Sequence, residues 1–184
     1  MNLPPADQPD TVGGSVHSGE GVKVEKAITI NRPISEVYSF WRQVENLPRF
    51  MPHLISVVPL SLTASHWTAQ TAKGKPVEWD ARIIEDKRDE LIAWQSLAGS
   101  EVDSAGSVRF TPAHGSRGTV LKVALKYAPT GGKLGNFFAT HFTRGAKKEI
   151  AASLFRLKSL LETGEMPTVQ GQPQGNHSSD HKCL

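Results

Sequence analysis

The 184-residue sequence has a single cysteine, Cys183, and no hydrophobic run long enough to span a membrane. One cysteine cannot form a disulfide within the chain, so an oxidising compartment is not indicated. Cys183 is also misplaced for prenylation, which requires a cysteine at the fourth position from the end. The N-terminus lacks the charged and apolar regions of a signal peptide. We therefore expect a cytoplasmic protein, and the membrane surface is the next location to test.

The excess of charge of one sign is small. The 21 Lys and Arg residues against 18 Asp and Glu residues give a net charge of +3. No Lys/Arg-rich run with interleaved aromatic residues occurs, so we expect no nucleic-acid partner. A weak attraction to anionic lipid is consistent with this charge.

Catalytic and metal-binding motifs are missing as well. The sequence contains no His-Glu-x-x-His, Gly-x-Ser-x-Gly or Cys-x-x-Cys. Segment 129–134 is placed like a phosphate-binding loop, but it lacks the upstream glycine and the Ser/Thr after its lysine. His177, His181 and Cys183 lack a fourth metal ligand. We expect no cofactor and no metal site.

Two short apolar helices are predicted within residues 33–53. Pro33 suits the beginning of a helix, and Val37 and Trp41 recur at helical spacing. Asn46 is the expected N-cap of a second helix, which the prolines on either side keep short. We expect this pair of helices to close one end of a sheet.

Strand patterns fill the segment that follows. The alternation is clearest where Leu121, Val123 and Leu125 share one face of the last run. The runs, which turn residues separate, are 66–72, 77–84, 91–97, 104–111 and 119–127. With a first strand before the short helices and a further strand-like run that begins at Leu54, they predict an antiparallel sheet of about seven strands with one covered face.

A long helix is predicted after the last strand. Apolar residues recur at steps of three and four from Leu134 to Glu162, which gives the helix one apolar stripe. Gly164 is the expected C-cap. Gly145 is a weak point within the helix, at about 1 kcal/mol relative to Ala.

This order of elements resembles the START-like helix-grip superfamily (SRPBCC). More narrowly, the chain resembles bacterial polyketide cyclase/dehydrase-type proteins related to the coenzyme Q-binding START proteins. The resemblance covers about residues 22–175 and implies an α+β fold, in which a curved antiparallel sheet wraps around the long helix beside an apolar cavity. It implies no particular ligand, because one fold hosts many functions. The matching segments are 24–33, 37–41, 46–53 and 77–81, and for the narrower match 93–97, 106–110 and 160–165.

One domain is expected from the length and the 38% hydrophobic composition. The periodic patterns lie within residues 22–165, which we take as the START-like domain. Residues 1–21 are rich in Pro and Gly, and residues 166–184 are rich in Gln, Gly, Ser and His. Both ends are therefore expected to be disordered tails.

Aromatic residues are the main candidates for ligand binding, because they come from nearly every predicted element. Any one aromatic residue belongs more often to a core than to a ligand wall. The helix-grip resemblance, however, implies a gap between the sheet and the helix that suits an apolar ligand. The expected ligand-binding residues are Phe50, Trp67, Trp79, Trp94, Phe110, Tyr127, Phe138 and Phe142.

Few polar residues are placed to anchor a ligand. His53 and Arg109 are the candidates, although a structural histidine and a solvent-facing arginine are the more common outcomes. Glu78 and Asp80 flank Trp79 on the opposite face of their strand, so we expect a solvated pair there.

A gate is expected just before the long helix. Gly131 and Gly132 permit the backbone movement that opening requires. Lys133 is placed to meet lipid phosphates, and Phe137 is placed to enter a bilayer. We therefore expect peripheral membrane contact at this lip.

These patterns favour a protein that binds a small hydrophobic molecule, such as a lipid or an isoprenoid quinone, without catalysing a reaction. One alternative is a polyketide cyclase or dehydratase, for which His53, Arg109 and Tyr127 are the proton-transfer candidates. A second alternative is an interaction module, in which the interior is only a packed core and the basic helix face and the tails meet a protein or a membrane.

Overall fold

The computed structural model describes residues 22–70, 75–100, 102–128 and 135–165. Within these ranges, residues 22, 116, 127–128 and 135–147 are described by their backbone alone. The segments 1–21 and 166–184, which the sequence predicts to be tails, lie outside the described residues.

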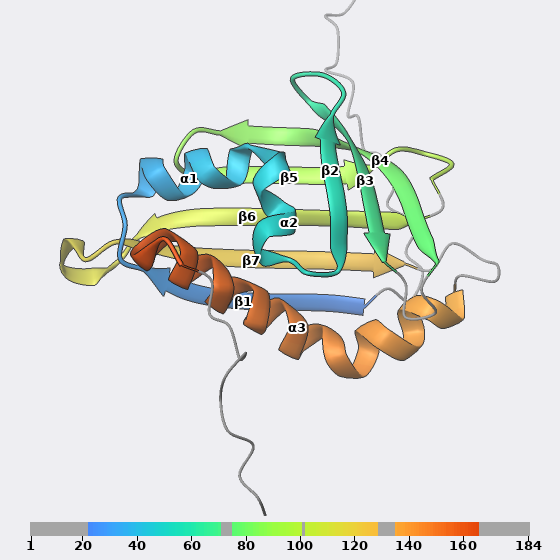
Figure 1. Ribbon diagram of the computed structural model, residues 1–184. Helices are drawn as coiled ribbons and strands as arrows, with labels where there is room; N and C mark the ends of the chain where they lie inside the picture. Colours follow the sequence, from blue (N-terminus) through green and yellow to red (C-terminus); the bar gives the residue numbers. More distant parts are fainter. Residues whose placement is uncertain (1–21, 71–74, 101, 129–134, 166–184) are drawn as a thin grey trace, which may run out of the picture.

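Within the described residues, seven antiparallel strands form one curved sheet in the order β1-β7-β6-β5-β4-β3-β2 (Figure 1). The strands are β1 (Val22–Ile30), β2 (Leu54–Pro59), β3 (Ala64–Gln70), β4 (Pro76–Lys87), β5 (Leu91–Ser96), β6 (Asp103–Pro112) and β7 (Thr119–Ala128). The helices are α1 (Ile34–Arg42), α2 (Leu47–Phe50) and α3 (Gly135–Thr163), with 3-10 turns η1 (Val44–Asn46) and η2 (His114–Ser116). This is the α+β helix-grip fold that the sequence predicts.

The long helix α3 covers the sheet on the side of β1, and it also contacts α2 (Figure 1). Its apolar stripe buries Ile150, Leu154, Leu157 and Leu161, as the helical spacing predicts. The predicted C-cap is confirmed at Gly164, which has a φ of 77° and donates its N–H to the carbonyl oxygen of Leu160.

The short helices differ from the prediction in one detail. α1 begins after Pro33, as expected. Asn46, however, makes no side-chain capping bond to α2 and has helical backbone angles. Its amide donates instead to the carbonyl oxygen of Phe40 at 3.1 Å. Asn46 thus occupies the predicted N-cap position, but its side chain ties η1 back to the end of α1 and does not cap α2.

Two register shifts interrupt the strand alternation. Between Leu54 and Ser56 the pairing of β2 with β3 shifts by one residue position. The end of β2 had not been predicted from the sequence. Between Ile83 and Glu85 the pairing of β4 with β5 shifts, and Ile84 is exposed. A β-bulge adds a residue to one strand only, so it breaks the period of two on which the prediction depends.

The junction between β1 and α1 is anchored to the end of α3. Arg32 donates to the carbonyl oxygens of Leu161 at 2.6 Å and Glu162 at 2.8 Å. The Glu162 carboxylate accepts the backbone N–H of Asn31 and a bond from Lys158, both at 2.6 Å. Burial alone would raise the pKa of Glu162, but these hydrogen bonds hold the pKa below its ordinary value of 4.5. Residues far apart in the sequence thus close one end of the domain.

Candidate ligand-binding cavity

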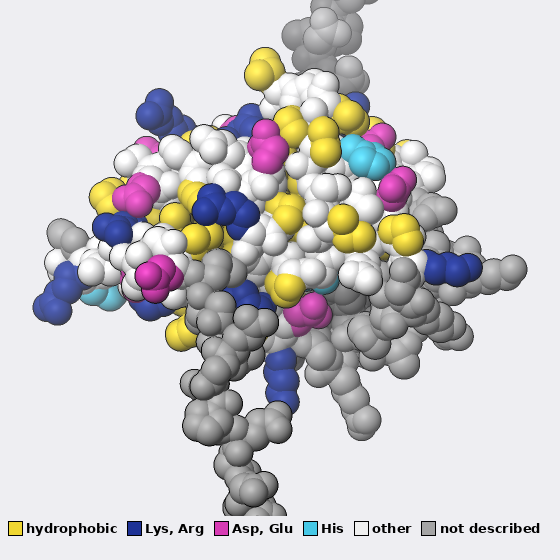
Figure 2. All heavy atoms as spheres, viewed as in Figure 1, with side chains coloured by type: hydrophobic (Ala, Val, Ile, Leu, Met, Phe, Trp, Pro, Cys, Tyr) yellow, Lys and Arg dark blue, Asp and Glu magenta, His cyan; other side chains and the backbone are white. Residues whose placement is uncertain are grey.

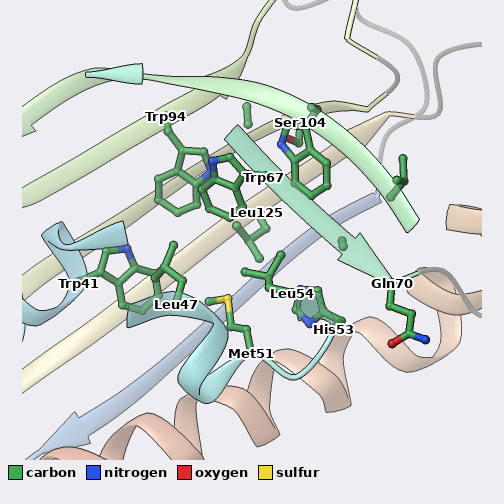
Figure 3. A pocket seen from close by; sticks show the side chains of 14 residues that line it. Trp41, Leu47, Met51, His53, Leu54, Trp67, Gln70, Trp94, Ser104 and Leu125 are labelled. Carbon is green, nitrogen blue, oxygen red and sulfur yellow. The ribbon is translucent and has the colours of Figure 1, made fainter. Parts of the chain in front are cut away.

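An apolar cavity lies between the inner face of the sheet and the short helices (Figure 3). Its volume is about 50 Å³. A cavity needs roughly 10–15 Å³ to hold one water molecule, so this space has room for a few waters. The cavity is lined by Trp41, Leu47, Met51, His53, Leu54, Trp67, Ala69, Gln70, Val77, Trp79, Trp94, Ser104, Ala105 and Leu125.

Three tryptophans on three successive strands form much of the wall. Trp67 on β3 and Trp79 on β4 are cross-strand partners, and their rings stack with centroids 5.7 Å apart and an interplanar angle of 25°. The indole N–H of Trp67 donates to the hydroxyl of Ser65 at 2.9 Å. The stacking and the hydrogen bond fix the ring of Trp67, so this part of the wall is preorganised.

A second, smaller cavity of about 20 Å³ lies beside the first. The two cavities share four lining residues, which are Trp41, Leu47, Trp67 and Trp94. Ile83 and Ile92 add further apolar wall to the smaller cavity. The shared side chains therefore form a partition between two neighbouring apolar spaces.

Two of the polar lining residues lie at one end of the larger cavity. Figure 3 shows His53 and Gln70 at the end opposite Trp41 and Leu47. The backbone N–H of Gln70 donates to the carbonyl oxygen of His53 at 2.9 Å, and the Gln70 side chain is exposed. The cavity thus has an apolar interior and one polar end near the surface, which suits an amphipathic molecule.

His53 connects this polar end to α3. Its Nδ1 lies 3.6 Å from Oε1 of Glu149, and the side chain is 16% exposed. Burial lowers the pKa of His53 from its ordinary value of 6.5, and the Glu149 carboxylate opposes part of that shift. The imidazole is therefore predominantly neutral at pH 7.

The outer face of the sheet carries a separate polar cluster. His66 Nδ1 lies 2.7 Å from Asp80 Oδ1, and its Nε2 lies 3.8 Å from Glu78 Oε2. These three side chains point away from Trp67 and Trp79, since neighbours along a strand face opposite sides. Glu78 and Asp80 therefore lie on the face that the sequence predicts, and they do not border the cavity.

Exposed apolar side chains lie mainly near the free edge of β2. In the view of Figure 2, hydrophobic side chains form separate spots among polar atoms. The largest exposed fraction, 87%, belongs to Leu62 in the turn between β2 and β3. The other large apolar residues that are exposed in the described part are Ile55, Val58, Leu60, Ile84 and Phe155.

A comparison with protein families shows to which family the chain belongs. The family model described as polyketide cyclase / dehydrase and lipid transport matches residues 30–155, which is more than half of the 184 residues. The chain belongs to the polyketide cyclase/dehydrase family.

Other members and neighbours extend this finding. The protein DR_A0006 of Deinococcus radiodurans is 33% identical, with a TM-score of 0.64 over 78% of this chain and 100% of that chain. The Zhui aromatase/cyclase of Streptomyces sp. R1128 is 15% identical, with a TM-score of 0.61 over 80% of this chain and 100% of that one. At that identity the likeness concerns the fold alone.

A curated relative matches over a shorter segment. It is an uncharacterised 17.2 kDa protein of Streptomyces lincolnensis, 35% identical over 88 residues. The matched segment covers 48% of this chain and 57% of the relative. The chain thus spans little more than half the length of that protein.

In this polyketide cyclase/dehydrase family member, four of the predicted site residues border one cavity. These are Trp67, Trp79, Trp94 and His53. Phe50 lies outside the lining, with 0% exposure, and its ring packs against those of Phe40 and Trp41. The other predicted residues either do not line the cavity or have side chains outside the described residues.

Phe110 is buried and does not line the cavity, and its ring makes a T-shaped contact with that of Tyr38. Arg109 is exposed on the outer face of β6, so it does not reach the cavity. The side chains of Tyr127, Phe138, Phe142 and Phe137 lie outside the described residues, as do Gly131, Gly132 and Lys133 of the predicted gate.

Several lining residues were not predicted. Trp41, Leu47, Met51 and Leu54 come from the short helices and the start of β2, where apolar residues were expected to close the sheet. The remaining lining residues are Ala69, Gln70, Val77, Ser104, Ala105 and Leu125. Trp41 and Leu47 could have been predicted as lining residues from their position in the two short helices. Helices that close one end of a sheet also border the space between themselves and the sheet.

Two further observations concern membrane spans and metal sites. No helix in the described ranges has the length and apolar character needed to cross a membrane. Among the residues that the structure describes, no group of His, Cys, Asp and Glu side chains is arranged to hold a metal ion.

Proposed function

We propose that the protein binds a small hydrophobic or amphipathic molecule, such as a lipid or an isoprenoid quinone, in the cavity beneath the short helices. The observation that carries this proposal is an apolar lining with four tryptophans and a polar end at His53 and Gln70. A binding site with this composition holds an apolar body by burial and orients it through a few polar contacts.

The cavity volume adds a condition. Sites for drug-sized ligands have volumes of roughly 300–1,000 Å³, whereas the cavity here measures about 50 Å³. Binding of a quinone or a lipid therefore requires the walls to move apart. Ligand entry should accordingly be slower than diffusion-limited binding to an open cleft.

Purification under native conditions followed by mass spectrometry tests the proposal. A retained small molecule of constant mass and one-to-one stoichiometry supports it. A short-chain quinone titrated into the ligand-free protein should quench tryptophan emission to a saturating limit. Absence of any retained molecule, together with linear and unsaturable quenching, contradicts it.

Transport or presentation at a membrane is the finer part of the same proposal. It predicts transfer of bound quinone to vesicles of anionic phospholipid at a rate that rises with vesicle concentration. A rate independent of vesicle concentration would mean that the ligand leaves through water, without membrane contact by the protein.

A cyclase or dehydratase is the second candidate, and the His53–Glu149 pair favours it. The neutral imidazole borders the cavity and lies near a carboxylate, so it has the components of a general base. If the protein converts a polyketide-like substrate, His53→Gln should lower kcat by at least about a hundredfold. Conversion at an unchanged rate in that variant would remove His53 from catalysis.

A further inference from the structure

Trp94, Gly106 and Leu125 form one row across three strands. Gly106 on β6 pairs with Trp94 on β5 and with Leu125 on β7. Both neighbours border the larger cavity, so the row lies on the inner face of the sheet. Gly106 is the position in the row that has no side chain.

The space above Gly106 is taken by the indole of Trp94. A Cβ atom at Gly106 would lie 2.4 Å from Cζ2 and 2.7 Å from Cε2 of Trp94, and 2.8 Å from Cδ2 of Leu125. Nonbonded carbon atoms pack at roughly 3.5–4.0 Å, so no side chain fits beneath this ring. The indole therefore lies directly on the backbone of β6, and it does so only because residue 106 is glycine.

The same indole borders both cavities. Trp94 is one of the four residues shared by the larger cavity of about 50 Å³ and the smaller one of about 20 Å³. Among those four, Trp94 is placed by contact with a glycine backbone, whereas Trp67 is placed by stacking on Trp79. The position of one ring thus contributes to where the larger cavity ends.

We propose that Trp94, seated on Gly106, is the residue that sets the maximum length of the bound ligand. The inference rests on the proposed function, since it assigns a specificity determinant to the same cavity. With the indole in place, an apolar chain that enters from the polar end stops at the partition. Without it, the chain continues into the smaller cavity.

A chain-length series of fatty acids tests this proposal, from octanoate to palmitate, with each acid displacing anilinonaphthalene sulfonate from the protein. In the parent, affinity should rise with length by about fourfold per buried methylene and then stop rising. In Trp94→Ala the rise should continue to acids longer by at least two methylenes. In Gly106→Ala, which forces the ring off the strand, the limit should move to shorter acids.

The double variant separates this role from a general effect of glycine on the strand. If Gly106 acts by seating the indole, Gly106→Ala should change the length limit little when Trp94 is already Ala. Ser107→Ala, one residue along β6 on the opposite face, is the matched control and should leave the parent's limit unchanged. Thermal unfolding of the parent, the two single variants at positions 94 and 106 and the double variant should show the same coupling. Gly106→Ala should lower Tm less when Trp94 is already Ala than it does in the parent.

The outcomes distinguish the two proposals. If the parent binds no fatty acid of any length and no quinone, the proposed function fails and the length selection fails with it. If the parent binds and Trp94→Ala keeps the same limit, this inference alone is overturned. Equal Tm losses from Gly106→Ala in both backgrounds would overturn the seating of the indole on Gly106.

Discussion

The guanidinium of Arg32 caps the end of α3 by donating to the carbonyl oxygen of Leu161 at 2.6 Å, across 129 positions of sequence. The last carbonyls of a helix have no partner within it, and a cation there also interacts favourably with the helix dipole. Arg32 therefore joins the junction after β1 to the element that covers the sheet.

Substitution of Arg32 tests that connection. Arg32→Ala should lower the free energy of unfolding by about 1.5–3 kcal/mol, because charge-assisted hydrogen bonds are lost. Arg32→Lys should recover less than half, since an ammonium cannot present two parallel donors. Urea denaturation measures both. Arg109→Ala, at an exposed arginine on the outer face of the sheet, should stay within about 0.5 kcal/mol of the parent.

Two glycines with positive φ provide a matched pair. Gly118 has a φ of 98°, and a Cβ there would lie 2.1 Å from the carbonyl oxygen of Ile30, whereas Gly99 has a φ of 82° with nothing within 4 Å. Gly99→Ala should cost about 1 kcal/mol from backbone strain alone. Gly118→Ala should cost about 3 kcal/mol or more, because β1 must also move. Equal midpoints in urea for the two variants would show that the Gly118 contact relaxes without cost.

His53 should make stability depend on pH. Because burial lowers its pKa below 6.5, the unfolded chain binds the proton more readily than the folded protein. This contribution to stability is complete above pH 6.5 and is lost as the pH falls from 6.5 toward the folded pKa. The free energy of unfolding should therefore decline more steeply over that window in the parent than in His53→Gln.

Glu149→Gln provides the complementary test. The negative charge of Glu149 favours the protonated imidazole and so opposes the lowering of the His53 pKa by burial. Without this charge the pKa of His53 should fall further, and the pH range over which stability is lost should extend to lower pH. NMR titration of the His53 ring measures this pKa directly. A rise in the pKa of His53 in Glu149→Gln would contradict the assigned role of the carboxylate.

Trp79 should contribute to ligand affinity. Trp79→Ala removes half of the stacked pair that forms the wall, so quinone binding should weaken at least about fivefold, or about 1 kcal/mol. Phe155→Ala, at a side chain that is 59% exposed on α3, is the control and should bind like the parent. Fluorescence titration through the remaining tryptophans provides the measurement, and equal affinities for all three proteins would remove the stacked pair from the binding site.

The fold could be predicted from the sequence because its signals are local. The stripe ending at Leu161 and the alternation of Leu121, Val123 and Leu125 appear within single elements. The bulge before Glu85 could not be predicted in this way, since a register shift is decided by the partner strand. The side-chain hydrogen bond of Asn46 could not be predicted either, because an asparagine can cap the helix that follows it or donate back to an earlier carbonyl such as that of Phe40.

The cavity was only partly predictable. The sequence shows that Trp67 and Phe50 are large and apolar, but it does not show whether a side chain borders empty space or other side chains. The structure puts Trp67 at the cavity and Phe50 against Trp41. That difference depends on how the short helices sit on the sheet. It therefore arises from packing between the helices and the sheet, and the hydrophobic pattern within a single helix or strand does not reveal it.

The strand order affects how the chain can fold during its synthesis. From β3 to β7 each strand pairs with the one made just before it, whereas β1, within the described residues, pairs with β7 and lies under α3. On the ribosome, β1 emerges first and then has no partner until β7 has been translated. Because contacts between distant segments form slowly, closing this edge should be the late step of folding. Until then the unpaired backbone of β1 is available to chaperones or to other nascent chains.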